Sequence, residues 1–313
     1  MKVYLNGRFV KLPDFIIPGA AKSGTTSLYY YLKSHPQIYL PKIKELCFFS
    51  FMGRDKTPWN TPLPVRNLEE YISCFKDATD EQKIGEFETY YLYYYKETIA
   101  NIKNVYKEKA KNLKIVIILR NPIERVLSQY LYAVQSFQEN LPFEQAIRLE
   151  TIKKRLERGM PSPLDYIGYS MYYNQVKAYM DNFPQVKVLL YDDLVNNPKS
   201  FLEELLNFLE VDFYLPDNIE NRYNVTKLPK NTFITYLFKI FLRLRLNEIL
   251  KKTDLKIYNK IKTFALNKLT ITPDKKAILT EKSTIYLKNI FKGDILKLEK
   301  LLNKDLSHWL DSY

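Results

Sequence analysis

The chain has 313 residues, and no Gly/Ser-rich or Pro-rich linker, repeat or low-complexity block divides it, so we expect one domain over residues 1–313. Its two cysteines, Cys47 and Cys74, are too few for a disulfide framework and lack metal-type spacing, which indicates a reducing compartment. The formal net charge of +13 favours an anionic partner.

Residues 1–8 lack the apolar core of a signal peptide, and no later run is long enough and uncharged enough to span a bilayer. We therefore expect a soluble, cytoplasmic protein.

The first predicted strand, residues 15–18, runs into G-A-A-K-S-G-T-T at 19–26, and helical periodicity follows. A glycine loop between a strand and a helix presents backbone N–H groups and the positive end of the helix dipole to an anion. The spacing is similar to the nucleotide P-loop, but Thr25 stands where that motif has lysine, and Lys22 lies three positions earlier. The loop is therefore expected to bind a phosphate group other than the β- and γ-phosphates of ATP. The alternative is that the loop binds no ligand and only connects the strand to the helix.

A strand is also predicted at 83–87 and another at 114–119, the latter followed at once by Arg120. Asn121 as N-cap, Pro122 as first helical residue and Glu124 as capping-box partner predict a helix beginning there. Arg120 thus lies at the carboxyl end of a strand, where open α/β sheets bind ligands, and its planar fork suits phosphate. Ser128 lies about two turns into the helix. The alternatives are a surface ion pair for the arginine and a helix-surface position for the serine.

A fourth strand at 187–191 completes a repeated strand-then-helix alternation. This pattern predicts an α/β fold with a mostly parallel central sheet flanked by helices on both faces. A helical C-terminal part follows from 275 to 310, with these residues expected in the core: Ile278, Leu279, Ile285, Leu287, Ile290, Ile295, Leu298, Leu301 and Leu302.

The positive charge is concentrated in residues 222–268, where twelve Lys and Arg face two acidic residues. Within it, 232–252 predicts a basic, apolar helix. One interpretation places this helix peripherally on an anionic membrane surface, and the other packs it on the core with its lysines reaching solvent. No nucleic-acid-binding signature accompanies the charge, so we expect no nucleic acid.

Two of these segments together resemble the sulfotransferases that use 3′-phosphoadenosine 5′-phosphosulfate (PAPS). P-G-A-A-K-S-G-T-T-S-L at 18–28 is similar to their phosphosulfate loop, and I-L-R-N-P-I-E-R-V-L-S-Q-Y at 118–130 to their 3′-phosphate motif. The resemblance covers about residues 14–309 and implies the sulfotransferase variant of the P-loop NTPase-like fold. It points to the glycan, heparan-sulfate-type branch, and to a soluble, bacterial-type member because a membrane anchor is not seen.

The resemblance implies that PAPS is the cofactor and that no metal is needed, because Lys22 and the loop supply the positive field. The 5′-phosphosulfate would be held by a run of loop residues: Lys22, Ser23, Gly24, Thr25, Thr26 and Ser27. Arg120 and Ser128 would hold the 3′-phosphate. Lys227 and Lys230, in a segment placed like a loop that closes over the cofactor, would touch phosphate or remain solvated.

Glu45 is the expected general base, since K-E-L-C-F-F at 44–49 resembles the K-E-x-H-F-F segment of that branch, in which the Glu has this role. Cys47 replaces the family His and is expected to be a small buried group. Phe48 and Phe49 would exclude water from the carboxylate. The alternative for Glu45 is a surface ion pair with a neighbouring lysine. The chain's two histidines, His35 and His308, are expected to be structural.

Residues 85–92, G-E-F-E-T-Y-Y-L, resemble the family's G-E-x-[ST]-P-x-Y-L, but Glu88 and Thr89 replace the hydroxyl residue and the proline. Acceptor contacts are therefore expected to differ, and Glu86 is a second candidate for proton handling or acceptor orientation. The predicted function is transfer of a sulfo group from PAPS to a hydroxyl or amine of a glycan or glycolipid. A P-loop kinase and a non-catalytic binder of an acidic glycan or membrane are the alternatives.

Overall fold

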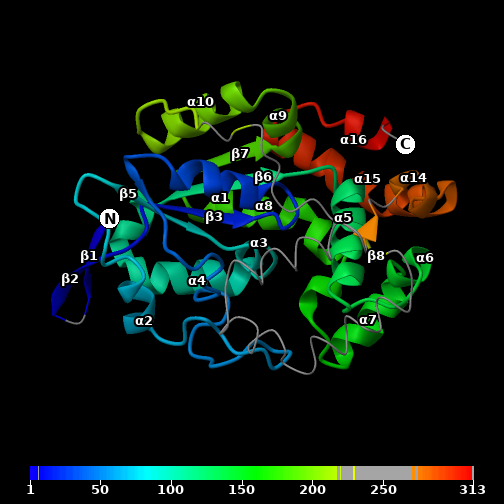
Figure 1. The fold of residues 1–313 in the computed structure, drawn as a ribbon, viewed down its shortest axis with the longest axis horizontal. Coiled ribbons are helices and arrows are strands. Elements are labelled where there is room, and N and C mark those ends of the chain that lie inside the picture. The colour runs from blue at the N-terminus through cyan, green and yellow to red at the C-terminus, as the bar shows by residue number, and fades with distance from the viewer. Residues whose placement is uncertain (6, 217–218, 220–227, 230–269, 272–273, 312–313) are drawn as a thin grey trace.

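The structure is a computed structural model that describes residues 1–5, 7–216, 219, 228–229, 270–271 and 274–311 (Figure 1). Its centre is a five-stranded parallel sheet in the order β4-β5-β3-β6-β7. The strands are β3 (Phe15–Gly19), β4 (Ile38–Tyr39), β5 (Lys83–Phe87), β6 (Lys114–Leu119) and β7 (Val186–Leu190). The predicted α/β fold with a parallel central sheet is confirmed, and β4 is a short edge strand that the sequence pattern missed.

Helices cover both faces of this sheet (Figure 1). The described helices of eight residues or more are α1 (Thr25–Lys33), α4 (Tyr95–Tyr106), α5 (Pro122–Gln135), α7 (Leu149–Glu157), α8 (Tyr172–Asn182), α10 (Pro198–Leu209) and α15 (Glu281–Leu302). The shorter ones are α2 (Leu68–Ser73), α3 (Tyr90–Tyr93), α6 (Phe143–Ala146), α9 (Tyr191–Asn196), α14 (Lys275–Ile278) and α16 (His308–Asp311). Two short antiparallel pairs also occur, the hairpin of β1 (Lys2–Leu5) with β2 (Arg8–Lys11) and the pairing of β8 (Leu228–Pro229) with β9 (Thr270–Ile271).

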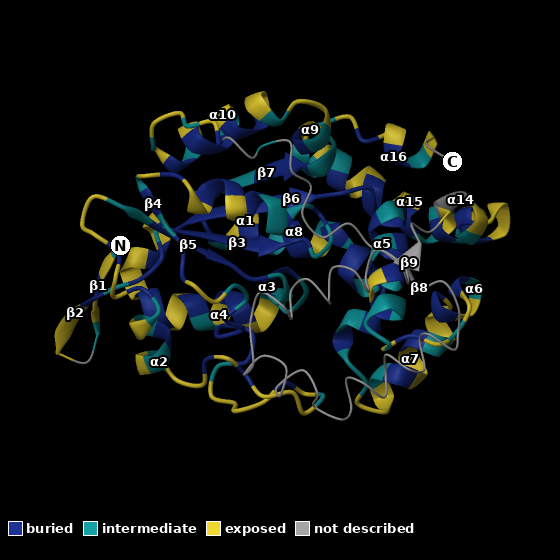
Figure 2. Ribbon diagram, in the orientation of Figure 1, coloured by how far each residue is buried: buried dark blue, intermediate teal, exposed yellow. Residues whose placement is uncertain are grey.

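Alternate residues of the central strands feed two separate hydrophobic cores. In β6, Ile115 and Ile117 pack in the core beneath α4, α5, α8 and α15, whereas Val116 and Ile118 pack in the core beneath α1 and α10. Every residue of β6 is buried, as Figure 2 shows for the centre of the sheet. A strand buried on both faces holds its carboxyl end rigidly, which matters for the residues that follow it.

The C-terminal part is helical, as predicted, but one of its apolar residues is not in the core. Leu287, Ile295 and Leu298 of α15 are buried, whereas Ile285 is 52% exposed because it lies on the opposite side of the helix. No described helix is long and apolar enough to cross a membrane. The predicted helix at 232–252, with Lys227 and Lys230, lies outside the described residues.

Replacement of Gly85 by Ala should destabilise the sheet. A Cβ at this position of β5 would lie 2.2 Å from the Phe15 ring of β3, its partner in register. We expect the free energy of unfolding to fall by about 1–3 kcal/mol, measured by chemical denaturation. Gly293 is the matched control: no atom lies within 4 Å of its added Cβ, so Gly293→Ala in exposed α15 should raise stability by about 0.5–1 kcal/mol. Equal effects of the two substitutions would contradict this packing.

Candidate active site

The phosphate-binding loop lies between β3 and α1, at the carboxyl edge of the sheet. Lys22 and Gly24 both have left-handed backbone angles, φ +69° and +81°, and Gly24 caps α1. An added Cβ on Gly24 would lie 2.9 Å from Leu194 and 3.0 Å from Tyr191, so this position needs glycine on two counts. The first backbone N–H groups of α1 have no partner inside the helix and are available to an anion at its N-terminus.

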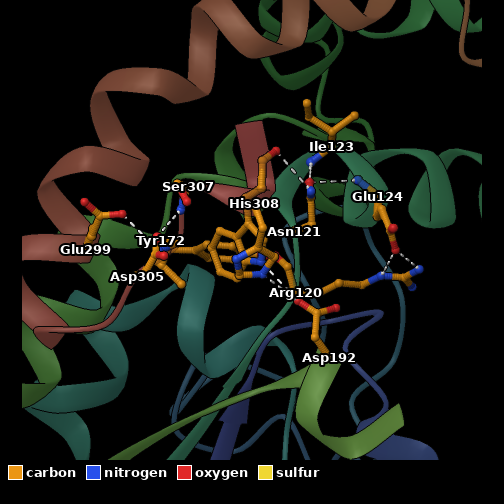
Figure 3. A network of polar contacts seen from close by, with 12 residues as sticks. Arg120, Asn121, Ile123, Glu124, Tyr172, Asp192, Glu299, Asp305, Ser307 and His308 are labelled. Carbon is orange, nitrogen blue, oxygen red and sulfur yellow. Dashed lines mark hydrogen bonds and ion pairs between the residues drawn. The ribbon is translucent and has the colours of Figure 1, made fainter. Parts of the chain in front are cut away.

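Arg120 follows β6 at the same edge of the sheet. Figure 3 shows its guanidinium facing the carboxylate of Glu124. Nη2 lies 2.6 Å and Nε 3.0 Å from Oε2, and Nη1 donates to the Lys22 carbonyl at 3.2 Å. Guanidinium has five N–H donors, so these contacts use three of them. The guanidinium also lies over the Tyr191 ring, 4.6 Å from its centre. These contacts fix the position of Arg120 and leave some of its N–H donors able to bind a ligand.

The residues around Arg120 fix where β6 ends and α5 begins (Figure 3). Asn121 caps α5, as predicted, by accepting from the Ile123 N–H at 2.9 Å. The Tyr172 hydroxyl donates to the Arg120 carbonyl at 3.0 Å. The Asn121 amide also donates to the Trp309 carbonyl at 3.1 Å, which ties α16 to this edge.

A cavity of about 720 Å³ lies at this edge and brings most of the predicted site residues together. Its lining includes these: Lys22, Gly24, Thr25, Thr26, Ser27, Glu45, Arg120 and Ser128. Ser23 does not line it. Ser23 is fully buried, its N–H donates to the Ala20 carbonyl, and its hydroxyl has no hydrogen-bond partner among the described residues.

Lys22 lies in a strongly positive and largely desolvated environment. Burial, and then the charges of Arg120 and Arg125, lower the pKa of Lys22 to about 8. Its ammonium lies over the Tyr132 ring, 4.3 Å from the centre, which stabilises the cation in part. An anion in the cavity would favour the charged form of this lysine.

Glu45 lines the same cavity as the loop and lies on a bend that is hydrogen-bonded to the end of β5. Its N–H donates to the Phe87 carbonyl at 3.1 Å, and its carboxylate accepts from the Thr89 hydroxyl at 3.3 Å. The Lys44 ammonium is 2.8 Å from Oε1, so the predicted alternative, an ion pair with a neighbouring lysine, is present in a residue that also lines the cavity. The Glu45 side chain is 38% exposed.

The expected drying of Glu45 by its phenylalanine neighbours is wrong. Phe48 and Phe49 point into the core, where Phe48 stacks on Tyr71 at 4.4 Å between ring centres. They therefore leave the Glu45 carboxylate open to solvent. The reason is the left-handed backbone at Glu45 and Cys47, which turns the chain between the carboxylate and the rings.

Glu86 is not part of the cavity lining, although burial raises its pKa to about 7. It is fully buried and accepts from the hydroxyls of Tyr71 at 2.5 Å and Tyr91 at 2.7 Å, which is a structural arrangement. Cys47 is buried, as predicted, and burial raises the pKa of its thiol, so it is a poor nucleophile.

The histidines divide between the interior and the surface. His35 is a buried structural residue whose Nε2 lies 2.9 Å from the Asp212 carbonyl. His308 is half exposed; its ring packs edge-on against Trp309, 6.1 Å between ring centres, as expected, and its Nε2 also lies 3.3 Å from the Asp192 carboxylate.

Several site residues escaped the sequence analysis, chiefly Tyr132, Tyr191 and the fully buried Arg125. Arg125 donates to the Tyr166 carbonyl at 2.9 Å and to the Ser170 hydroxyl, and no described carboxylate forms an ion pair with it. Tyr132 comes one helical turn after Ser128 on the same face of α5, and this spacing was the available signal. Tyr191 gave no such signal, because its contact with Arg120 depends on the order of β6 and β7.

Comparison with known proteins agrees with this fold. The family described as "Sulfotransferase family" matches residues 13–215, about two thirds of the chain, and the chain therefore belongs to the sulfotransferase family. The predicted family is confirmed. A crystal structure of a sulfotransferase from Alicyclobacillus acidocaldarius is 26% identical, with a TM-score of 0.67, and the match covers 96% of this chain and 99% of that one.

Curated relatives are more distant and longer. The membrane-associated sulfotransferase kil1 of Dictyostelium discoideum is 24% identical over 82% of this chain and 66% of its own length. Mouse heparan sulfate glucosamine 3-O-sulfotransferase 3A1 is also 24% identical, over 66% of this chain and 48% of its own. The human bifunctional heparan sulfate N-deacetylase/N-sulfotransferase 2 matches over 23% of its length at the same identity. The chain thus spans about two thirds or less of these relatives.

The lowered pKa of Lys22 predicts how stability depends on pH. A lysine with a pKa of about 8 in the folded state and an ordinary value of 10.5 when unfolded destabilises the fold while protonated. The penalty is complete below pH 8, shrinks as the pH rises toward 10.5, and is absent above it. Chemical denaturation should therefore show the stability of the wild type rising relative to Lys22→Met across this range. A pH-independent difference would contradict the burial of this charge.

Proposed function

We propose that this chain transfers a sulfo group from PAPS to a hydroxyl or amine of a glycan or glycolipid. The proposal rests on one observation: the α1 loop and the pair Arg120 and Ser128 line the same cavity. These two groups approach it from the ends of adjacent strands, β3 and β6. A ligand with one phosphate on the 3′ carbon and one on the 5′ carbon of an adenosine ribose would be held by both.

The residues present fit such a cofactor. The cavity is roomy enough for a nucleotide, and the N-terminus of α1, Lys22 and Arg120 give its walls a positive field. The loop N–H groups and the Thr25 and Thr26 hydroxyls would bind the 5′-phosphosulfate. Arg120, with the donors that Glu124 and Lys22 do not use, would bind the 3′-phosphate together with Ser128.

PAPS, when bound, supplies an activated sulfo group: the acceptor oxygen or nitrogen forms a bond to the sulfur, and the bond between the sulfur and the phosphate oxygen breaks. Lys22 would neutralise the charge that develops on that phosphate oxygen. Glu45 would take the acceptor proton as the new bond forms. The Thr89 hydroxyl and the Lys44 ammonium, both on Oε1, would orient the Glu45 carboxylate and leave Oε2 to the acceptor.

The acceptor class rests on two kinds of support. The relatives named for heparan sulfate act on a glycan, and the cavity adds Tyr90 and Tyr169 as aromatic walls beside Glu45. Aromatic side chains offer an apolar face with a polar edge, which suits a sugar ring. The predicted cytoplasmic location and membrane contact through 232–252 remain predictions, and that helix lies outside the described residues.

Ligand binding should separate the sulfotransferase from its alternatives. In thermal-shift experiments, 3′,5′-adenosine bisphosphate should stabilise the protein by mass action, whereas ATP with magnesium should have little effect. Arg120→Met should weaken the bisphosphate strongly and leave 5′-AMP almost unaffected, because only the former carries a 3′-phosphate. Stabilisation by ATP with magnesium alone would indicate the kinase, and stabilisation by neither nucleotide would indicate the non-catalytic binder.

Replacement of Glu45 by Gln should lower turnover by about 10²- to 10⁴-fold, because a glutamine cannot take the proton. Binding of 3′,5′-adenosine bisphosphate should be retained, since Glu45 is not among the residues proposed to hold either phosphate. The measurement is transfer of radiolabelled sulfate from PAPS to a panel of polysaccharides, glycolipids and small alcohols. Lys22→Ala should lower turnover to a similar degree. Wild-type turnover in Glu45→Gln would remove the assignment of the base.

A further inference from the structure

Glu88 follows β5 and is fully buried next to the bend that carries Glu45. Its carboxylate accepts from two backbone N–H groups, with Oε2 at 2.7 Å from Cys47 N and Oε1 at 3.0 Å from Tyr90 N. The Glu88 N–H donates to the Ile17 carbonyl of β3 at 3.1 Å. One residue therefore links three parts of the fold: its side chain joins the Glu45 bend to the first turn of α3, and its backbone N–H joins both to the central sheet.

The bend needs this link because its backbone is strained. Glu45 has a φ of +66° and Cys47 a φ of +60°, which are left-handed angles that non-glycine residues seldom adopt. Such angles persist only where surrounding contacts impose them. Two bonds do so here: the Glu45 N–H reaches the Phe87 carbonyl, and the Cys47 N–H reaches Glu88.

Glu88 is buried with two backbone hydrogen bonds but without a cationic partner among the described residues. No Lys or Arg among the described residues forms an ion pair with it, although Lys44 pairs with nearby Glu45. Burial, and then the charge of Glu45, raise the pKa of Glu88 to about 8. Buried groups with such perturbed acidity are concentrated at functional sites.

We propose that Glu88 is a positioning residue for Glu45, whose carboxylate it keeps directed at the cavity by fastening the N–H groups of Cys47 and Tyr90. This role rests on the proposed function of Glu45. The same bonds place Tyr90, whose side chain lines the cavity beside Glu45. Glu88 therefore acts on the acceptor side of the site and not on the cofactor.

A double-substitution cycle tests the role. Glu88→Gln keeps the shape but replaces one acceptor oxygen with an NH₂ donor, which opposes one of the two N–H groups. We expect kcat to fall about 10- to 100-fold through misplacement of the base, with the affinity for 3′,5′-adenosine bisphosphate unchanged. When Glu45 is already Gln, adding Glu88→Gln should cause no further fall, because the group that it positions is gone.

Glu86→Gln is the matched control, since Glu86 is an equally buried carboxylate two residues earlier that contacts tyrosine hydroxyls away from the cavity. It should lower stability and leave kcat near that of the wild type. A wild-type kcat in Glu88→Gln, or an equal fall with and without Glu45, would overturn the role. Wild-type turnover in Glu45→Gln alone would instead identify the base as the failed assignment.

If Glu88→Gln does not fold, Glu88→Asp replaces it in the same cycle. Aspartate keeps the carboxyl group but is one methylene shorter, so its oxygens cannot reach both N–H groups at hydrogen-bond distance. The same loss of kcat, absent when Glu45 is Gln, supports positioning, and an independent loss overturns it.

Discussion

The positive charge at the carboxyl edge of the sheet is the constraint on which the rest of the site depends. Lys22, Arg120 and Arg125 lie close enough for the two arginines to depress the pKa of the lysine, after burial has already done so. Like charges gathered in a desolvated place destabilise a fold unless an anion joins them. Glu124 offsets part of this positive charge through its ion pair with Arg120. The rings of Tyr132 and Tyr191 stabilise Lys22 and Arg120, respectively, through their π faces. An anionic cofactor would complete the balance.

The fold holds these cations in place through the cap of α5 and through the close approach of the α1 loop to α9. Asn121 caps α5 and binds the Trp309 carbonyl, so the turn after β6 is fixed from the C-terminal end of the chain. Because Gly24 has no Cβ, the α1 loop can lie close to α9. Tyr191, the first residue of α9, contacts the Arg120 guanidinium there. Rigid strand ends and tight caps give the N–H groups and the guanidinium fixed directions before a ligand arrives, which is the condition for electrostatic preorganisation.

Sequence patterns were sufficient for the parts of the site that follow from local rules. A buried β-branched strand followed by Asn-Pro predicts the β6–α5 turn, and a glycine loop after an apolar run predicts the β3–α1 turn; both place their residues at one edge of a parallel sheet. Contacts that depend on tertiary structure, such as that of Lys22 with the Tyr132 ring, could not be predicted from the sequence. The rings of Phe48 and Phe49 were misplaced because left-handed angles at Glu45 and Cys47 reverse a pattern that extended backbone would give.

The two sides of the cavity differ in how they are built. The side proposed to bind the cofactor is formed by strand ends and helix starts, and it carries the segments that resemble the family motifs, at 18–28 and 118–130. The side proposed to bind the acceptor is formed by the bend at Glu45 and the turn after β5, where Cys47, Glu88 and Thr89 depart from those motifs. A phosphate requires donors in fixed directions, whereas acceptors differ in shape. Because Glu88 bonds to the Cys47 N–H, the departures at these two positions form one local structure, and acceptor choice is expected to be set there.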